Sequence, residues 1–345
     1  MAGTESVAQA IRDASPPFSA TCPADDSNPP TDVILRSCDL VDYHVHKMIL
    51  SFCSPFFREM FAFPEPGPGD ADANPTKDGK PVVLMAESCA ALEKVLLVCY
   101  PRLAGGHTIR DLDGVGEAYE AVKKYDISGG TALLESVLLD PIFSQREPLR
   151  VFALGCWLNL DVVIKTAAEA SLKLSSIHPP APVKELESIS AIKLWQFNEL
   201  HIAFTTKVRG FLSGFAEPQP HGMSGYGKGF SWTSRTWWPN TSHDDCPLEF
   251  DTATATEWAI YPAPWFIEHL TRICRAPHIN DIPTITQAIV HLSTDTVAEI
   301  TKCPICLERV QNDLHTLAKN FEDCVELARE TVGLSSSPSV YVSVR

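Results

Sequence analysis

The residues that most clearly suggest chemistry are two cysteines near the C-terminal end, Cys303 and Cys306, in the sequence CPICLE. Two thiolates separated by two residues can bind one tetrahedral zinc ion, so a Cys-x-x-Cys pair is a common metal-binding element. A second pair, His243 and Cys246, occurs in the sequence HDDC. Together the four residues predict a closed Cys3His zinc site of the structural type, because no coordination position is left for a substrate.

The sequence between these two pairs favours the zinc interpretation. Residues 214–256 are rich in Gly, Trp and Ser without periodicity, and so long an irregular segment is unusual inside a compact domain. A zinc ion at its end would offset the entropy lost when this segment becomes ordered. The alternatives are that the cysteines are simply buried thiols, or that His315 and Cys324 are substitute ligands. The sequence does not fit a RING finger, since only His315 and Cys324 follow CPIC, whereas a RING finger needs six further ligands in tight spacing.

Composition and charge restrict the class of protein. The chain has 345 residues, 45% of them hydrophobic, and a net charge of -15. Acidity without a dense Lys/Arg cluster argues against binding to nucleic acid. No stretch approaches the roughly 20 apolar residues of a membrane span, and residues 1–20 do not resemble a signal peptide. The odd count of 11 cysteines favours a reducing, intracellular location, in the cytoplasm or nucleus.

The N-terminal third must supply a hairpin followed by two short helices. DVILRS (residues 32–37) and VDYHV (41–45) each read as a strand, and the turn residues between them predict a β-hairpin. The period then becomes helical from 47 to 53. Ser54 is a good N-cap and Pro55 fits the first helical position, so we expect a second helix to start there.

The rest of the chain predicts mostly helices. After a third strand at 81–86, apolar residues at i, i+3, i+4 and i+7 mark one buried helix face at 92–99. Similar spacings predict helices around 115–125, 133–138, 148–174 and 194–212, and helices resume near residues 265, 285 and 307. In the final helix, apolar residues recur every three or four positions and form a stripe that we call the seam. We expect the seam to pack against helices of the same chain. Its members are Leu307, Val310, Leu314, Leu317, Phe321 and Cys324.

The order of these N-terminal elements resembles the BTB/POZ domain. The family pattern is D-V, then H-K-x-x-L, then S-x-x-F-x-x-M-F, and it falls here on Asp32, Val33, His46, Lys47, Leu50, Ser54, Phe57, Met60 and Phe61. VLLVCYP and EAYEAVKKYDI are similar to stretches in the family's later helices. The remainder resembles the helical extension of BTB proteins common in fungi. Those proteins tend to have two Cys-x-x-Cys-like pairs, so His243 departs from that pattern.

The resemblance implies both a fold and an interface. The implied fold class is α+β, with an N-terminal BTB/POZ α/β domain followed by a mostly α-helical C-terminal region. In the family, the first helices pack against another copy of the domain. Asp32 and Lys47 match a buried charged pair near the family's dimer interface, and His46 matches a histidine that ties the helix start to the sheet. The alternative is that these are ordinary structural residues.

These expectations divide the chain into four segments. Residues 1–29 are rich in Pro and Asp and are expected to be a disordered leader. The BTB/POZ domain would cover 30–142 and the helical extension 143–212. Residues 213–345 would form a Trp/Gly-rich loop and a helical region with the zinc knuckle.

The resulting functional hypothesis is a non-catalytic scaffold protein. It would form a homodimer or bind a sibling BTB protein, without nucleic-acid or membrane partners. The alternative is a substrate adaptor of a cullin ubiquitin ligase, as many BTB proteins are. Such adaptors often have a hydrophobic-x-Glu element where this chain has residues 101–114, which contain no Glu. An enzyme is not expected, because GxSxG, HExxH and Walker A motifs are absent from the sequence.

Overall fold

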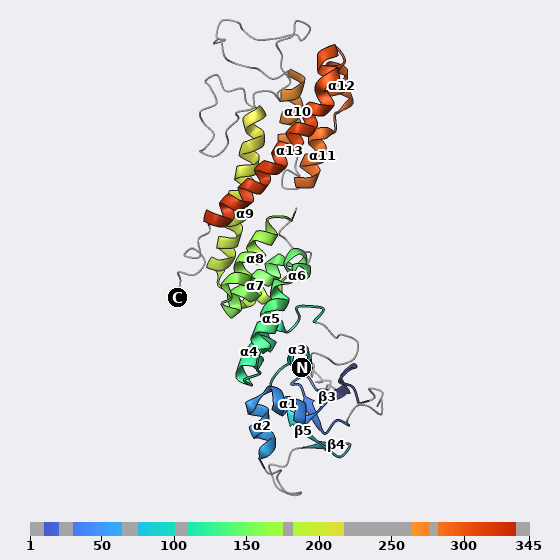
Figure 1. Ribbon diagram of the computed structural model, residues 1–345, viewed down its shortest axis with the longest axis vertical. Coiled ribbons are helices and arrows are strands. Elements are labelled where there is room, and N and C mark those ends of the chain that lie inside the picture. Colours follow the sequence, from blue (N-terminus) through green and yellow to red (C-terminus); the bar gives the residue numbers. More distant parts are fainter. Residues whose placement is uncertain are drawn as a thin grey trace, which may run out of the picture. The chain divides into compact units, whose positions relative to one another are not determined.

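The structure is a computed structural model that describes residues 10–20, 30–63, 75–100, 109–174, 182–216, 264–275 and 282–335. Its contacts divide the chain into two compact units, Met1–Ala167 and Ala168–Arg345. The first unit contains a sheet with helices, and the described part of the second is helical (Figure 1). This is the α+β architecture expected from the sequence. Within the described residues, no helix is long and apolar enough to cross a membrane.

The first unit is built on a mixed five-stranded sheet with the order β1-β3-β2-β5-β4. The expected hairpin is present: β2 (Val33–Arg36) pairs antiparallel with β3 (Val41–Val45). β5 (Lys80–Leu84) runs parallel to β2, and β4 (Thr76–Lys77) is the antiparallel edge beside it. All of β3 is buried, so its polar residues must find partners inside the fold.

The first strand corrects the expectation of a disordered leader over residues 1–29. β1 (Arg12–Asp13) pairs in parallel with β3. Phe18 is buried, and its carbonyl accepts a hydrogen bond from the His44 N–H at 2.9 Å. Residues 10–20 are therefore an ordered part of the domain, and Ala14 and Phe18 belong to its core. Composition could not indicate this, because the strand is only 2 residues long and depends on partners far away in the sequence.

The two helices after β3 begin and end as the sequence predicts. α1 (Lys47–Cys53) is followed directly by α2 (Pro55–Ala62). The Ser54 hydroxyl accepts a hydrogen bond from the Phe57 N–H at 3.1 Å, so it caps α2, and Pro55 occupies the first helical position. α3 (Cys89–Cys99) buries the apolar face that its spacing indicated.

The remaining helices of the first unit are α4 (Val115–Lys124), α5 (Gly130–Leu139), α6 (Pro141–Arg146), α7 (Pro148–Leu158) and α8 (Asp161–Ser171), the last of which crosses into the second unit. α6 was not expected as a separate helix. Its start is set by Asp140, whose carboxylate accepts from the Ile142 N–H at 2.9 Å. α4 approaches α7 closely at Gly116, where an added Cβ would lie 2.1 Å from the Trp157 ring.

The second unit contains a 3-10 helix (Lys184–Ser188), α9 (Ala191–Ala216), α10 (Pro264–Arg275), α11 (Ile282–Val290), α12 (Thr294–Ile300) and α13 (Pro304–Ser335). α13 packs against α9 and α11. The predicted seam is buried within this unit at Val310, Leu314, Leu317 and Phe321.

Two members of the predicted seam differ from expectation. Leu307 is exposed, and Cys324 is only half-buried. Leu307 lies in the first turn of α13, where the buried positions are taken by Cys306 and by Cys303, which directly precedes the helix. The seam therefore begins at Val310, one turn later than the spacing suggested.

Candidate interaction surface

α1 exposes two large apolar side chains on one face, which we call the α1 face. Met48 is 72% exposed and Phe52 is 90% exposed. They are one helical turn apart, so they lie side by side along the helix. Apolar groups that adjoin on a surface and are surrounded by polar residues are typical of a binding surface.

The opposite side of α1 holds the helix on the domain. Leu50 is fully buried, and Ile49 and Cys53 pack partly buried against the same core. α1 is therefore apolar on both sides although it needs only one side for the core. A helix that is apolar all round normally has a second surface to cover it. The α1 face is where such a surface would bind.

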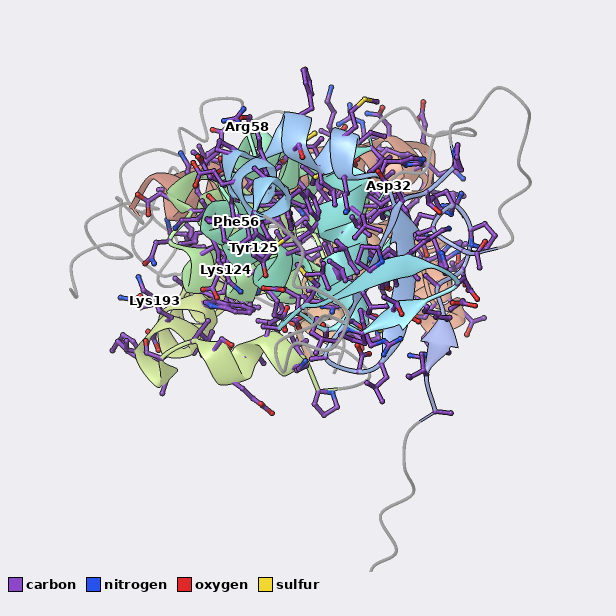
Figure 2. All side chains as sticks on the ribbon, turned by 90° about the horizontal axis from the view of Figure 1, so that it is seen from below. Asp32, Phe56, Arg58, Lys124, Tyr125 and Lys193 are labelled. Atoms are coloured by element: carbon purple, nitrogen blue, oxygen red, sulfur yellow. The ribbon has the colours of Figure 1, made fainter. Side chains whose placement is uncertain are left out.

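Asp32, the residue just before β2, fixes the start of α1. Its Oδ1 accepts a hydrogen bond from the Lys47 N–H at 2.7 Å, which caps the helix at a position where the preceding His46 provides no side-chain cap. The Lys47 ammonium lies 5.7 Å from the centre of the Phe61 ring. Asp32, labelled in Figure 2, is exposed in the single chain, so burial of the predicted Asp32–Lys47 pair would require a partner chain.

His46 connects α1 to the end of α3. Its N–H donates to the Tyr100 hydroxyl at 2.9 Å, and its Nδ1 lies 3.3 Å from the same oxygen. Tyr100 is the residue that ends α3. Burial raises the pKa of Tyr100, so its hydroxyl stays protonated. His46, which directly follows β3, thus links the start of α1 to the end of α3, and its predicted link to the sheet stays a prediction.

A buried carboxylate holds the strands beside these helices. Asp42 in β3 is 0% exposed and accepts two hydrogen bonds from Arg36, from Nε at 2.6 Å and from Nη2 at 3.0 Å. Lys77 in β4 donates to Asp42 at 2.8 Å and to Asp13 in β1 at 2.7 Å. Burial alone raises the pKa of Asp42, but the hydrogen bonds from Arg36 and Lys77 outweigh it and lower the pKa below its usual value.

An aromatic cluster orients α2. The rings of Phe56 and Phe57 each lie 5.1 Å from the ring of Tyr125, which ends α4. The Tyr125 hydroxyl donates to Glu87 at 2.6 Å, and the Lys124 ammonium lies 3.0 Å from the same carboxylate. Figure 2 shows Phe56, Tyr125 and Lys124 close together. Because α1 leads directly into α2, this cluster also fixes the direction of the α1 face.

The predicted zinc ligands are described only in part. Cys303 and Cys306 are both buried at the start of α13, and the Cys306 N–H donates to the Cys303 sulfur at 3.5 Å. His243 and Cys246 lie outside the described residues. Among the described residues, no group of three or more His, Cys, Asp or Glu side chains could hold a metal ion. A tetrahedral site at Cys303 would therefore need ligands from elsewhere in the chain.

The substitute ligands do not fit the same site. His315 and Cys324 lie 9 and 18 residues beyond Cys306 on the continuous helix α13. A helix rises about 1.5 Å per residue, so they are about 14 and 27 Å further along its axis. Zinc–ligand distances are only about 2.0–2.3 Å. Neither residue can complete a site with Cys303 and Cys306 within this helix.

The fold and the α1 face together define a protein-interaction domain. The domain consists of a mixed sheet covered by helices, and one of these helices, α1, exposes apolar residues. Capping and packing residues hold α1 in place. Residues 25–140 match the family model of the BTB/POZ domain, so this part of the chain is a BTB/POZ domain, a protein–protein interaction module. The resemblance to the BTB/POZ domain is thereby confirmed, and the similarity of the remainder to fungal BTB proteins stays a prediction. No curated protein matches the chain.

Proposed function

We propose that the BTB/POZ domain joins two copies of this chain, or this chain and a sibling, and so acts as a non-catalytic scaffold. The observation that carries this proposal is the 90% exposure of Phe52 with Met48 one turn away. Removing such side chains from water contributes about 1.5–3 kcal/mol each. Two copies related by a two-fold axis would cover both patches at once.

Charges beside the α1 face support a self-complementary contact. Asp32 is an exposed carboxylate, and Lys47 is a cation on the same end of the helix. In a two-fold interface the same patch is used on both copies, so Asp32 of one copy can meet the Lys47 side chain of the other. His46 holds this end of α1 in place through Tyr100. These three residues thus form the rim of the proposed interface.

Substitution of Phe52 with glutamate should dissociate the proposed dimer. A central apolar anchor typically contributes 2 kcal/mol or more, so we expect the dissociation constant to rise by about thirtyfold or more. Sedimentation equilibrium of the full chain measures this constant directly. Ile142→Glu is the matched control, because Ile142 is a helical residue with 66% exposure that lies outside the α1 face.

Three outcomes are informative for this experiment. A dimer that is weakened by Phe52→Glu and unchanged by Ile142→Glu supports the proposal. A monomeric wild-type chain, or a dimer equally stable in both variants, contradicts it. Circular dichroism of Phe52→Glu should match that of the wild type, since the side chain contributes little to the core.

The cullin adaptor is the second candidate, and the sequence supports it less well. The segment 101–114 contains no Glu for the hydrophobic-x-Glu element that the family resemblance places there. Residues 101–108 lie outside the described part of the chain. Binding of a purified cullin N-terminal domain to the wild-type chain would favour the adaptor function, especially if Phe52→Glu leaves that binding unchanged.

We also propose one structural zinc ion held by His243, Cys246, Cys303 and Cys306. Its support is the N–H···S hydrogen bond within CPIC and the burial of both thiols at a helix start. A helix N-terminus favours thiolates, which are the zinc-binding form of cysteine. When bound, the ion would stabilise the fold of the second unit without taking part in a reaction.

Native mass spectrometry of zinc-replete protein should show one zinc per chain. Chelation should remove it and lower the melting temperature, because metal binding is coupled to folding. Cys303→Ser should lose the metal, whereas Cys324→Ser, the half-buried cysteine on the same helix, should keep it. A metal-free wild type, or equal zinc content in both variants, would refute the site.

A further inference from the structure

α1 and α3 bring two cysteines together at their C-terminal ends. Cys53 is the last residue of α1 and Cys99 is the last residue of α3. The Cys53 thiol donates to the Cys99 carbonyl oxygen at 3.6 Å, so its sulfur lies against the residue that carries the second thiol. The sequence places them 46 residues apart, so only the packing of the two helices makes them neighbours.

The two thiols differ in exposure and acidity. Cys99 is buried, whereas Cys53 is half-buried. The neighbouring Cys99 side chain outweighs the effect of burial and lowers the pKa of Cys53 to about 7. The same interaction, together with burial, raises the pKa of Cys99. Near neutral pH, about half of Cys53 is therefore thiolate, whereas Cys99 keeps its proton.

We propose that Cys53 and Cys99 form a reversible disulfide when hydrogen peroxide reaches the BTB/POZ domain. The Cys53 thiolate attacks one peroxide oxygen, the O–O bond breaks, and the leaving hydroxide takes a proton to become water. This step gives a sulfenic acid on Cys53. The Cys99 sulfur then attacks the Cys53 sulfur, the S–O bond breaks, and the departing hydroxyl leaves as water with the Cys99 proton.

The reaction balances without any further reactant. Two thiols and one hydrogen peroxide give one disulfide and two waters, with both sulfurs oxidised and both peroxide oxygens reduced. A dithiol reductant reverses it. The product links the end of the helix that carries Phe52 to the end of α3, so the oxidised domain holds the α1 face covalently on its core.

Another cysteine of the same domain provides a matched comparison. Cys89 is also half-buried, but its side chain interacts with Asp39 and Arg12 rather than with a second thiol. Burial and the neighbouring Asp39 carboxylate raise the pKa of Cys89. Cys89 therefore has similar access to solvent without the activation that the Cys53–Cys99 contact provides.

Peptide mapping under non-reducing conditions tests the proposal directly. Trypsin places Cys53 in residues 48–58 and Cys99 in residues 95–102, each with a single cysteine. After limited hydrogen peroxide, mass spectrometry of the full chain should show these two peptides joined, and dithiothreitol should separate them. Cys53→Ser should abolish the joined peptide, and Cys89→Ser should leave it unchanged. In Cys99→Ser, dimedone should trap a sulfenic acid on Cys53.

A second measurement uses the acidity of Cys53. Its rate of alkylation should reach half its maximum near pH 7, compared with about 8.5 for an ordinary cysteine. The proposal is wrong if folded wild-type protein accumulates Cys53 sulfenic acid without the joined peptide, or if Cys53 is alkylated as slowly as Cys89. Running the oxidation in Phe52→Glu as well separates this result from the oligomeric state, because the disulfide lies within one chain.

Discussion

Replacement of Asp42 with alanine should lower the free energy of unfolding of the BTB/POZ domain by about 3–5 kcal/mol. The Asp42 carboxylate is 0% exposed and is bonded to two cations, Arg36 and Lys77. Removing it leaves the Arg36 guanidinium, which is 12% exposed, without its bidentate partner. Three strands lose a common connection, because Arg36 lies in β2, Asp42 in β3 and Lys77 in β4.

Hydrogen exchange measured by mass spectrometry on peptides from 30–100 should detect this loss. This method reports on the BTB/POZ domain separately from the second unit, so the whole chain need not unfold in a single two-state transition. Asp113→Ala is the control, because the Asp113–Arg150 ion pair has a carboxylate that is 69% exposed. We expect that change to cost under about 1 kcal/mol. Equal losses in the two variants would contradict the role of Asp42.

The same carboxylate should make stability depend on pH. The pKa of Asp42 is lowered in the folded state, so its stabilising contribution is present above the unfolded-state pKa and is lost as pH falls through the folded value. Wild-type protein should therefore lose stability below about pH 4. Asp42→Ala should show a shallower acid slope. Some slope remains in the variant, since the pKa of Asp13 is lowered as well.

Replacement of Phe57 with alanine should cost about 3–5 kcal/mol of folding free energy. Phe57 is 1% exposed and contacts the rings of Phe56, Phe61 and Tyr125. Truncation leaves a cavity between α2 and the end of α4 that the neighbouring aromatic rings cannot fill. α2 would lose its orientation, and α1, which leads directly into it, would become less firmly held.

The adjacent residue provides the control for this prediction. Phe56→Ala removes the same number of atoms from the same helix, but Phe56 is 44% exposed. Its loss should cost roughly 1–2 kcal/mol, since about half of the ring is already in water. The two variants are compared by their free energies of unfolding in urea, measured by hydrogen exchange in peptides that cover α2. A cost for Phe56→Ala as large as that for Phe57→Ala would show that burial does not determine the effect.

Local patterns in the sequence predict much of the fold. The hairpin, the Ser54 cap with Pro55 behind it and the buried face of α3 each depend on residues within one or two turns, so spacing alone identifies them. The BTB/POZ resemblance also rests on such local patterns and is confirmed by the match over residues 25–140. The segment that carries the α1 face was predicted as a helix for the same reason.

The features that the sequence did not reveal depend on distant partners. β1 needs β3, Asp42 needs Lys77 35 residues away, and Cys53 needs Cys99. None of these pairs shows a periodic signal, because each lies across two elements whose register is set by tertiary packing. The exposure of Phe52 could not be predicted either, because the spacing of apolar residues does not indicate which of them face the core. His243 and Cys246 stay predictions, since they lie outside the described residues.

The hydroxyl of Ser54 connects the two helices that flank the aromatic cluster. It accepts from the Phe57 N–H at the start of α2 and donates to the Tyr125 carbonyl at the end of α4. Since Ser54 is fully buried, fraying of either helix end would leave this hydroxyl short of a partner. The first turn of α2 and the last turn of α4 should therefore open and close as one cooperative unit, although they are more than 60 residues apart in the sequence.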